Sequence, residues 1–189
     1  VGPAGWRGWA ANVDRLNLKR RSAFYGDWWD EAAQWRTGGF DRLCGGVQGS
    51  PTTPELAERG VRGTLFVHQL LAVRPGAVLD HLAAVAEVQV PLWRQYGHEP
   101  TGIYEVLGNQ HEAVVVWATS IGEHTRLRAA RDAARGLSDE AEPDDRLVDW
   151  ERRAAGTVVG GDTHLMTPMP GTVYGPDSWE EASLDDWMP

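Results

Sequence analysis

The sequence predicts an α+β fold in residues 62–169, with an antiparallel sheet and helices against one of its faces. Three observations support this prediction. Strand-like and helix-like segments follow one another in the order strand, helix, strand, strand, helix pair, strand. Hydrophobic residues make up 42% of the 189 residues, which suffices for a packed core. A similar segment upstream predicts an incomplete copy of the same unit.

The first strand is predicted in "RGTLFVHQLLAVRPG" (62–76), where β-branched and aromatic residues precede a Pro-Gly breaker. The next helix is predicted from apolar residues at spacings of three, four and seven, namely Val78, Leu82, Val85, Leu92 and Tyr96. We expect Gly97 to end this helix. We also expect a bend at Pro91, because proline cannot donate a hydrogen bond to the carbonyl of Glu87.

Two short strands are predicted after this helix, in "TGIYEVLG" (101–108) and "EAVVVWAT" (112–119). The residues between them, Asn109-Gln110, are typical of a hairpin turn. A helix is predicted over 121–135, because Ser120 and Glu123 form a capping-box pattern at its start. The sheet therefore gains two strands before the second helical region begins.

A second helical piece is predicted in "DDRLVDWERRAAG", with Pro143 as its first helical residue. Residues 157–169, "TVVGGDTHLMTPM", have the composition of a final strand. This order is that of a ferredoxin-like βαββαβ unit. Its antiparallel sheet has helices on one side only, so its other face needs cover. The pattern therefore predicts assembly through sheet faces.

The upstream segment "WDEAAQWRTGGFD" (29–41) aligns without a gap on "WERRAAGTVVGGD" (150–162). Helices are predicted over 6–18 and 23–37 and a strand over 39–47, in the same order as in the second half of the complete unit. Residues 1–47 are therefore predicted to be a partial copy. The alternative is chance similarity between two amphipathic helices.

Two further segments complete the expected organisation. Residues 48–61 are predicted to be a linker between the partial copy and the complete one, with a helix start at Thr53-Pro54. Residues 170–189 are predicted to be an acidic C-terminal tail that carries Trp179 and Trp187. The tail is either solvated or an arm whose two tryptophans anchor on a neighbouring subunit.

Three stretches, "LLAVRPG", "VQVPLWRQYG" and "TGIYEVLGNQHEAVVVWA", resemble the NIPSNAP-like proteins of the dimeric α/β-barrel superfamily. The resemblance covers roughly residues 62–168, and "WWDEAAQWRTGGFDRL" resembles the end of a preceding copy in tandem members. It implies a dimeric α/β-barrel with a mostly apolar cavity between two sheets. Relatives include cofactor-independent monooxygenases, muconolactone isomerase-like enzymes, haem-binding peroxidases and ligand-binding regulators, and fold alone does not choose among them.

Three residues are candidates for acid–base catalysis. His68 lies mid-strand, in alternation with Phe66 and Leu70, so it faces the cavity if that side of the strand does. His164 lies two residues after Asp162 and shares a strand face with it. Tyr104 is the third candidate. The alternative for His68 is a packed histidine with a structural hydrogen bond.

Four residues are candidates for substrate binding. Trp93, Tyr96 and Trp117 can stack on an aromatic ligand, although aromatic residues at such spacings are commonly part of a core. Asp162 can pair with His164, or it can form a turn after Gly160-Gly161. No metal site is predicted, because the six histidines and the single Cys44 show no ligand spacing. No cofactor is predicted either.

The net charge of −9 argues against a nucleic acid or an anionic membrane as partner. A basic stripe over 126–135 is interrupted by an acid and is predicted to be a solvated helix face. One cysteine and no apolar run of membrane-spanning length favour a cytoplasmic location. These features leave a small-molecule ligand as the expected partner.

Two functional hypotheses follow. The first is a metal-independent enzyme of the natural-product tailoring type, a monooxygenase or an isomerase/cyclase, that acts on a small apolar or aromatic metabolite. The second is a noncatalytic small-ligand-binding or assembly module whose cavity is filled by side chains. In both cases we expect a homo-oligomer, or a second chain that completes the partial copy.

Overall fold

The structure, a computed structural model, describes residues 5–20, 23–37, 42–172 and 174–175. The chain forms two compact units, residues 1–45 and 46–189. The first unit contains the helices α1 (Gly5–Arg20) and α2 (Ala23–Gln34). The boundary between the units falls within the short strand β1 (Cys44–Gly46). The two helices predicted upstream are present, whereas part of the predicted strand over 39–47 lies outside the described residues.

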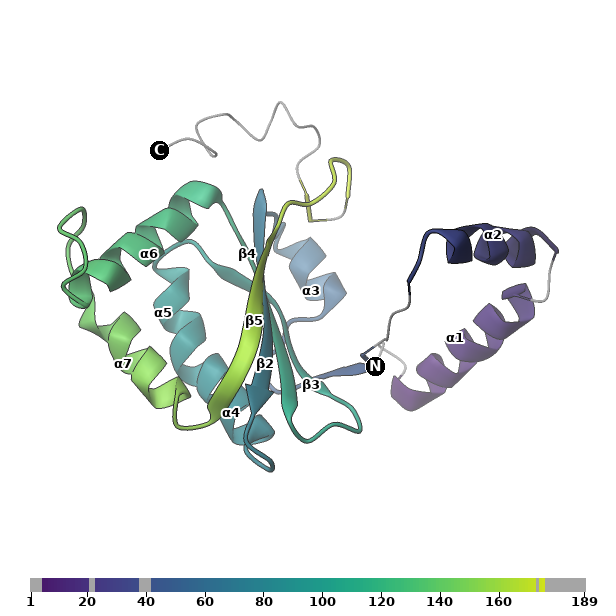
Figure 1. The fold of residues 1–189 in the computed structure, drawn as a ribbon, viewed down its shortest axis with the longest axis horizontal. Helices are drawn as coiled ribbons and strands as arrows, with labels where there is room; N and C mark the ends of the chain where they lie inside the picture. Colours follow the sequence, from purple (N-terminus) through teal and green to yellow (C-terminus); the bar gives the residue numbers. More distant parts are fainter. Residues whose placement is uncertain (1–4, 21–22, 38–41, 173, 176–189) are drawn as a thin grey trace. The chain divides into compact units, whose positions relative to one another are not determined.

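The second unit contains the remaining elements, namely α3 (Thr53–Glu58), β2 (Leu65–Val73), α4 (Val78–Ala84), the π-helix η1 (Val85–Gln89), α5 (Val90–Arg94), β3 (Glu99–Val106), β4 (Glu112–Thr119), α6 (Ile121–Ala134), α7 (Asp145–Ala154) and β5 (Val158–Met166) (Figure 1). The strand order in the sheet is β1-β3-β4-β2-β5. Strand β4 is antiparallel to β2 and β3, and β5 is antiparallel to β2. The predicted α+β fold with an antiparallel sheet is confirmed.

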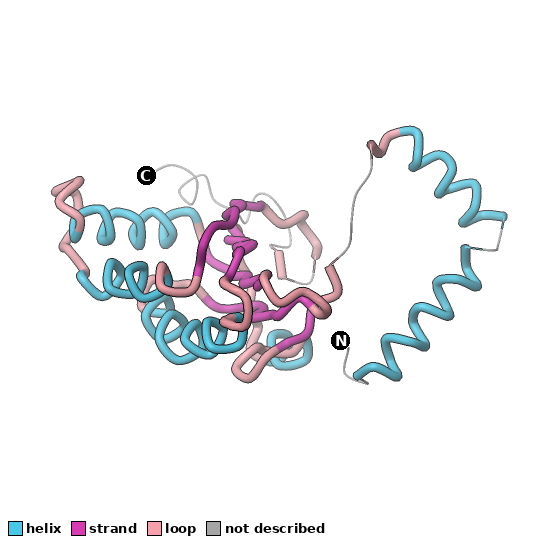
Figure 2. The backbone as a smooth tube through the Cα atoms, turned by 60° about the horizontal axis from the view of Figure 1, so that its bottom comes forward, coloured by secondary structure: helices cyan, strands magenta, loops and turns pink. Residues whose placement is uncertain are grey.

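Helices α4 to α7 lie together on one side of the sheet (Figures 1 and 2). Alternate strand residues such as Val67, Ile103 and Val115 pack there in one core with Leu82 and Leu127 of the helices. Because successive side chains of a strand point to opposite faces, the residues between them face the other way. The sheet therefore carries two layers of side chains, one packed against the helices and one facing away from them.

We call the face turned away from α4 to α7 the open face. The strand registers and their alternation place on it Phe66, His68 and Leu70 of β2, Tyr104 of β3, Val114 and Val116 of β4, and Asp162, His164 and Met166 of β5. On β2, β3 and β4 these side chains are buried or half-buried, whereas on the edge strand β5 they are exposed. The open face is mostly apolar, and its polar side chains include the two imidazoles, Asp162, Tyr104 and, at the start of β4, Glu112.

The helix predicted after β2 contains a π-helical turn instead of a simple bend at Pro91. In η1 the backbone N–H of Val90 donates to the carbonyl of Val85, one residue further back than in an α-helix. Pro91 then enters the first turn of α5, where a missing N–H costs little. Gly97 follows α5 with a φ of 71°, in the left-handed region that favours glycine.

Two helix starts are governed by the side chains of their caps. The Ser120 hydroxyl accepts a hydrogen bond from the Glu123 backbone at 3.2 Å, as the sequence predicts. The start predicted at Pro143 is wrong, because α7 begins at Asp145. Asp144 is its N-cap, and its carboxylate accepts a hydrogen bond from the Arg146 backbone at 3.1 Å. Proline has no side-chain acceptor and cannot take that role.

Strand β5 passes through both glycines that were candidates for a turn. Gly161 has a φ of 143°, and a Cβ there would collide with the carbonyl oxygen of Leu70. Gly161 is paired with Leu71, close to the register shift between Ala72 and Val73. Glycine is therefore needed for β5 to approach β2 this closely, and Asp162 lies mid-strand rather than in a turn.

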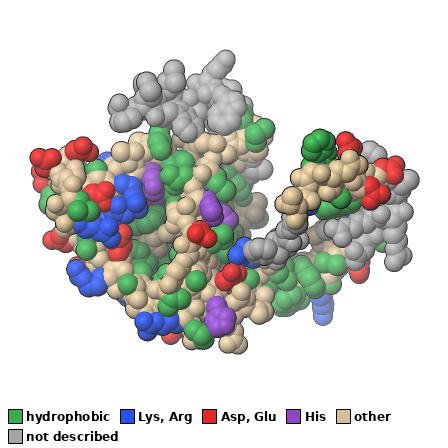
Figure 3. Space-filling model, viewed as in Figure 1, with side chains coloured by type: hydrophobic (Ala, Val, Ile, Leu, Met, Phe, Trp, Pro, Cys, Tyr) green, Lys and Arg blue, Asp and Glu red, His purple; other side chains and the backbone are tan. Residues whose placement is uncertain are grey.

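Basic side chains gather over α6 and α7 (Figure 3). Arg131 lies within 3.6 Å of a Glu151 carboxylate oxygen, and Arg135 pairs with the same carboxylate. The predicted basic stripe thus contributes to the contact between α6 and α7. Within the described ranges of the chain, no helix is both long enough and apolar enough to cross a membrane.

Candidate functional site

His68 and His164 lie side by side on the open face. They are cross-strand partners in the register of β2 and β5, so their side chains leave the sheet on the same side. Their ring centroids are 6.4 Å apart, with an angle of 54° between the ring planes. The structure thus brings together two residues that the sequence places 96 positions apart.

Two rows of side chains cross the open face. One row runs Tyr104, Val114, Leu70, Asp162, and the adjacent row runs Gly102, Val116, His68, His164. The two imidazoles therefore lie at the end of one row. Asp162 lies at the end of the other row, on β5 like His164. With strands about 4.8 Å apart, His68 lies about two strand spacings from the backbone of Gly102. This is the width of a small aromatic molecule.

Tyr104 leans across these rows because Gly102 has no side chain. A Cβ at Gly102 would overlap the Tyr104 ring, so the glycine leaves the space in which that ring lies. The Tyr104 hydroxyl is 3.5 Å from the carbonyl oxygen of Thr101. Tyr104 is thus on the same face as His68.

Trp93 and Trp117 lie on the opposite side of the sheet from His68. Trp117 is 0% exposed, and its indole N–H donates to the Gln69 side-chain oxygen at 2.9 Å. The Trp93 ring is 4.7 Å from the Trp117 ring. These two predicted substrate-binding residues therefore form part of the helix-side core, and the structure does not bring them together with the imidazoles.

Tyr96 also lies on the helix side, where it joins the end of α5 to the start of α7. Its hydroxyl donates to an Asp144 carboxylate oxygen at 2.8 Å. Burial, followed by this hydrogen bond, raises the pKa of Tyr96 to about 12. Hydrogen bonds from Arg146 are the main reason that the pKa of Asp144 falls to about 2. The hydrogen bond between Tyr96 and Asp144 is therefore a structural contact between the end of α5 and the start of α7, and Tyr96 is not on the face that carries His68.

A buried pair of histidines was missed by the sequence analysis. His98 is 1% exposed, and its Nδ1 lies 3.0 Å from the Tyr96 carbonyl oxygen. Because a carbonyl only accepts, Nδ1 carries the proton, and His98 Nε2 accepts from His124 Nδ1 at 3.1 Å. Burial lowers the pKa of His98 to about 4. No motif links two histidines 26 residues apart, so no sequence signal could have identified the pair.

Another buried histidine, His81, bonds through Nδ1 to the Thr157 hydroxyl at 2.9 Å. Burial lowers the pKa of His81, which favours its neutral form. In the part of the chain that the structure describes, no three His, Cys, Asp or Glu side chains gather as a set of metal ligands. On the open face, imidazole, carboxylate and phenol groups can support proton transfer and hydrogen bonding.

Comparisons with known proteins give a family resemblance. No protein-family model matches the sequence, and no curated protein matches it. The chain is similar to the crystal structure of a NIPSNAP family protein from Agrobacterium tumefaciens, with 12% identity, a TM-score of 0.45, and coverage of 59% of this chain and 91% of that one. It is also similar to an uncharacterized NIPSNAP domain protein from Burkholderia xenovorans, with 14% identity, a TM-score of 0.43, and coverage of 57% and 97%. The resemblance to NIPSNAP proteins predicted from the sequence is thus found among solved structures.

Proposed function

We propose that the open face forms one wall of a small-molecule site, and that the protein is a metal-independent acid–base enzyme. Its substrate is a small apolar or aromatic metabolite, and its reaction is of the monooxygenase or isomerase/cyclase type. The observation that supports this proposal is the placement of His68 beside His164 on a mostly apolar sheet face. An apolar wall with a few convergent polar groups is the usual design of such a site.

The two imidazoles suit a proton transfer between carbon and oxygen. One imidazole, in its neutral form, takes a proton from the carbon next to a substrate carbonyl. The electron pair of the broken C–H bond forms a carbon–carbon double bond, and the π pair of the carbonyl moves to its oxygen. The other imidazole donates a proton to the oxygen, so that an enol forms and charge is balanced. Asp162 lies two residues from His164 on the same strand face, so we propose that it contributes a hydrogen-bond acceptor to the polar part of this wall.

The remaining apolar side chains of the open face would hold the hydrocarbon part of the substrate. Leu70 and Val116 flank the His68 position in the register, and Met166 follows His164 on β5. Burial of such side chains against a ligand contributes about 25 cal/mol per Å². A noncatalytic ligand-binding module would use the same wall without proton transfer, and this is the second hypothesis.

A second sheet is proposed to cover the open face. It would come from another copy of the chain, or from a second chain that completes the partial copy predicted in residues 1–47. Within the described residues, β5 is paired only with β2, and Met166, its apolar side chain on the open face, is exposed. Exposed apolar edge strands commonly pair with further protein. The internal repeat, the cytoplasmic location and the natural-product role stay predictions.

Exchange of carbon-bound hydrogen is expected to depend on both imidazoles. The protein is incubated in deuterium oxide with a panel of small aromatic ketones, and deuterium uptake at the carbon next to the carbonyl is followed by mass spectrometry. Replacement of His68 or His164 by alanine is expected to lower the exchange rate by about a hundredfold, which is typical of a lost general acid or base.

The control for this experiment is His111→Ala, because His111 is exposed in the loop between β3 and β4. It should leave the exchange rate unchanged. Equal rates in the wild-type protein, H68A and H164A would overturn the enzyme proposal. Ketones that bind the wild-type protein without any deuterium uptake would favour the noncatalytic ligand-binding module.

Self-association is expected to require the centre of the open face. Leu70→Asp puts a charge in the middle of this face, and it should weaken association in sedimentation velocity by at least about tenfold, since a buried charge without a partner is costly. Leu79→Asp, on an exposed position of α4, is the matched control and should associate like the wild type. Wild-type protein that stays monomeric at all concentrations would contradict cover by a second copy.

A further inference from the structure

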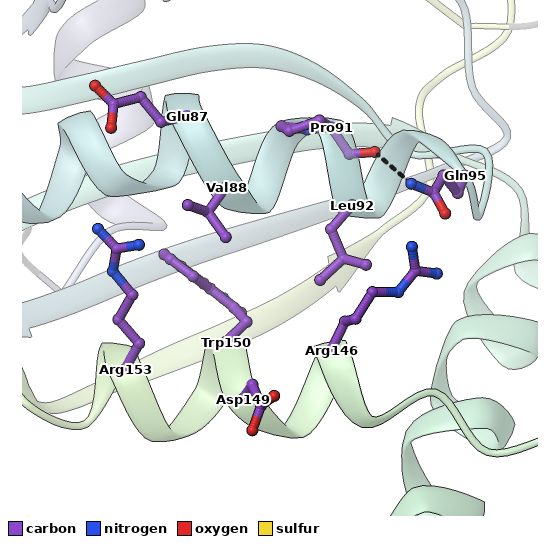
Figure 4. Close-up of a pocket in the computed structure, with 9 residues that line it drawn as sticks. All are labelled: Glu87, Val88, Pro91, Leu92, Gln95, Arg146, Asp149, Trp150 and Arg153. Atoms are coloured by element: carbon purple, nitrogen blue, oxygen red, sulfur yellow. Dashed lines mark hydrogen bonds between the residues drawn. The ribbon is translucent and has the colours of Figure 1, made fainter.

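A groove lies on the helix side of the sheet, between α7 and the continuous run of η1 and α5 (Figure 4). Its volume is about 440 Å³, within the range of pockets that hold small organic ligands. In Figure 4 the side chains of Val88 and Leu92 point towards Trp150 across the groove. The sheet separates these residues from His68 and His164, so the groove is distinct from the open face.

The apolar floor of this groove is firmly held. Trp150 is 6% exposed and belongs to the helix-side core, as does Leu92. The Trp150 side chain also lies 6.0 Å from the His81 ring. A ligand on this floor would therefore meet a preformed aromatic and aliphatic surface, which lowers the entropy cost of binding.

The wall opposite α7 contains the π-helical turn. Val88 belongs to η1, and Pro91 follows it at the start of α5. A π-helical turn places its side chains differently from an α-helix and occurs frequently at functional sites. In Figure 4 the Glu87 carboxylate of the same turn is directed away from Trp150. The π-helical turn thus presents an apolar side chain to the groove.

The charges around the groove are not all balanced. Arg146 is neutralised by Asp144, with an Nη2 to Oδ2 distance of 2.8 Å, and Asp149 is paired with Arg152 at 2.5 Å. Arg153 and Glu87 also line the groove, and neither has an ion-pair partner among the residues that the structure describes. The Arg153 guanidinium extends from α7 towards the η1 wall in Figure 4. Arg153 is therefore a cation without an ion pair beside the apolar floor, and the Glu87 carboxylate on the facing wall is directed away from that floor.

We propose that this groove binds a small amphipathic anion, an aromatic or aliphatic body with a single carboxylate or sulfonate group. The body lies against Val88, Leu92 and Trp150, and the acid group accepts hydrogen bonds from Arg153. A guanidinium matches the two oxygens of such a group better than any other side chain. The proposal does not depend on the acid–base function of the open face, since no residue is shared.

The test uses 8-anilinonaphthalene-1-sulfonate, an aromatic sulfonate whose fluorescence rises in apolar surroundings. Titration of the full chain with Arg153→Gln is expected to show about fivefold weaker binding than the wild type, from loss of the charge-assisted hydrogen bonds. Arg74→Gln is the matched control, because it removes the same charge at an exposed position outside the groove. Its affinity should stay close to that of the wild type.

A second variant tests the groove by volume instead of charge. Val88→Phe fills the space above Trp150 and should also weaken binding, while the far-UV circular dichroism spectrum stays that of the wild type. Equal affinities for R153Q, R74Q and the wild type would overturn the proposal. So would a loss of binding in Leu70→Asp alone, because the probe would then lie on the open face.

The chain's own acidic segment is the competing occupant. Residues 177–187 carry five acids and two tryptophans, which have the chemistry to enter the same groove. The full chain with Asp185→Asn and Asp186→Asn is expected to bind the probe as the wild type does. A clear rise in probe affinity in that variant would assign the groove to the acidic segment and overturn the small-anion proposal.

Discussion

Replacement of Trp117 by alanine is expected to lower the free energy of unfolding by about 4 kcal/mol, as large-to-small changes in a core do. Trp117 is 0% exposed and packs against Trp93, with ring centroids 4.7 Å apart. Truncation would leave a large cavity under β4 and an unpaired Gln69 amide, because the indole N–H donates to the Gln69 oxygen. Urea unfolding, followed by far-UV circular dichroism, measures the change.

Two other variants make this prediction specific. Trp35→Ala removes a side chain that is 83% exposed, and it should change the free energy of unfolding by less than about 0.5 kcal/mol. Trp117→Phe keeps most of the ring volume, so its loss of unfolding free energy should lie between the losses for Trp117→Ala and Trp35→Ala. A loss below about 1 kcal/mol for Trp117→Ala would show that Trp117 is not part of a close-packed core.

Lowering the pH from 7 to 4 is expected to cost about 3 kcal/mol of stability, and His98 is the main cause. Burial lowers the pKa of His98 from 6.5 to about 4 in the folded protein. Because the unfolded chain binds the proton more readily, stability begins to fall near pH 6.5, and the loss is complete near pH 4. This difference in pKa corresponds to about 3 kcal/mol. Burial also lowers the pKa values of His124 and His81, so both add to the loss.

Chemical unfolding at intervals of half a pH unit measures this dependence. His98→Gln should remove most of the change between pH 7 and pH 4.5, whereas His111→Gln, at an exposed position, should keep it. The carboxylate of Asp144 does not interfere, because its pKa is lowered from 3.8 to about 2 and its contribution is lost below about pH 4. If His98→Gln lost stability with falling pH as steeply as the wild type, His98 would not be the main cause of the pH dependence.

Local patterns predicted the elements of the second unit well. Strand β4 was predicted over 112–119 and forms Glu112–Thr119, and Ser120 caps α6 as expected. The errors arose where two local signals competed. Pro143 was placed as the first helical residue of α7, but Asp144 has the side-chain acceptor that a cap requires. Pro91 was expected to bend the helix, and the chain forms a π-helical turn before it instead.

The candidate site could be predicted only in part. His68, His164, Tyr104 and Asp162 were each chosen from their own strand, and the strand registers place all four on one face. Trp117 was chosen by the same reasoning, and it lies in the core on the opposite face. Alternation along a strand divides its residues into two sets, but it does not say which set the helices cover. That choice is made by packing.

The sequence by itself determined which segments are helices and strands, where several of them begin, and that the sheet is antiparallel with helices packed against it. These properties depend on residues a few positions apart, so a local pattern is enough to predict them. Only the tertiary structure decided that His164 lies beside His68, that His98 meets His124, and that Trp150 of α7 faces Val88 of the π-helical turn. Such contacts depend on strand register and helix packing between distant segments, and no short stretch of sequence contains that information.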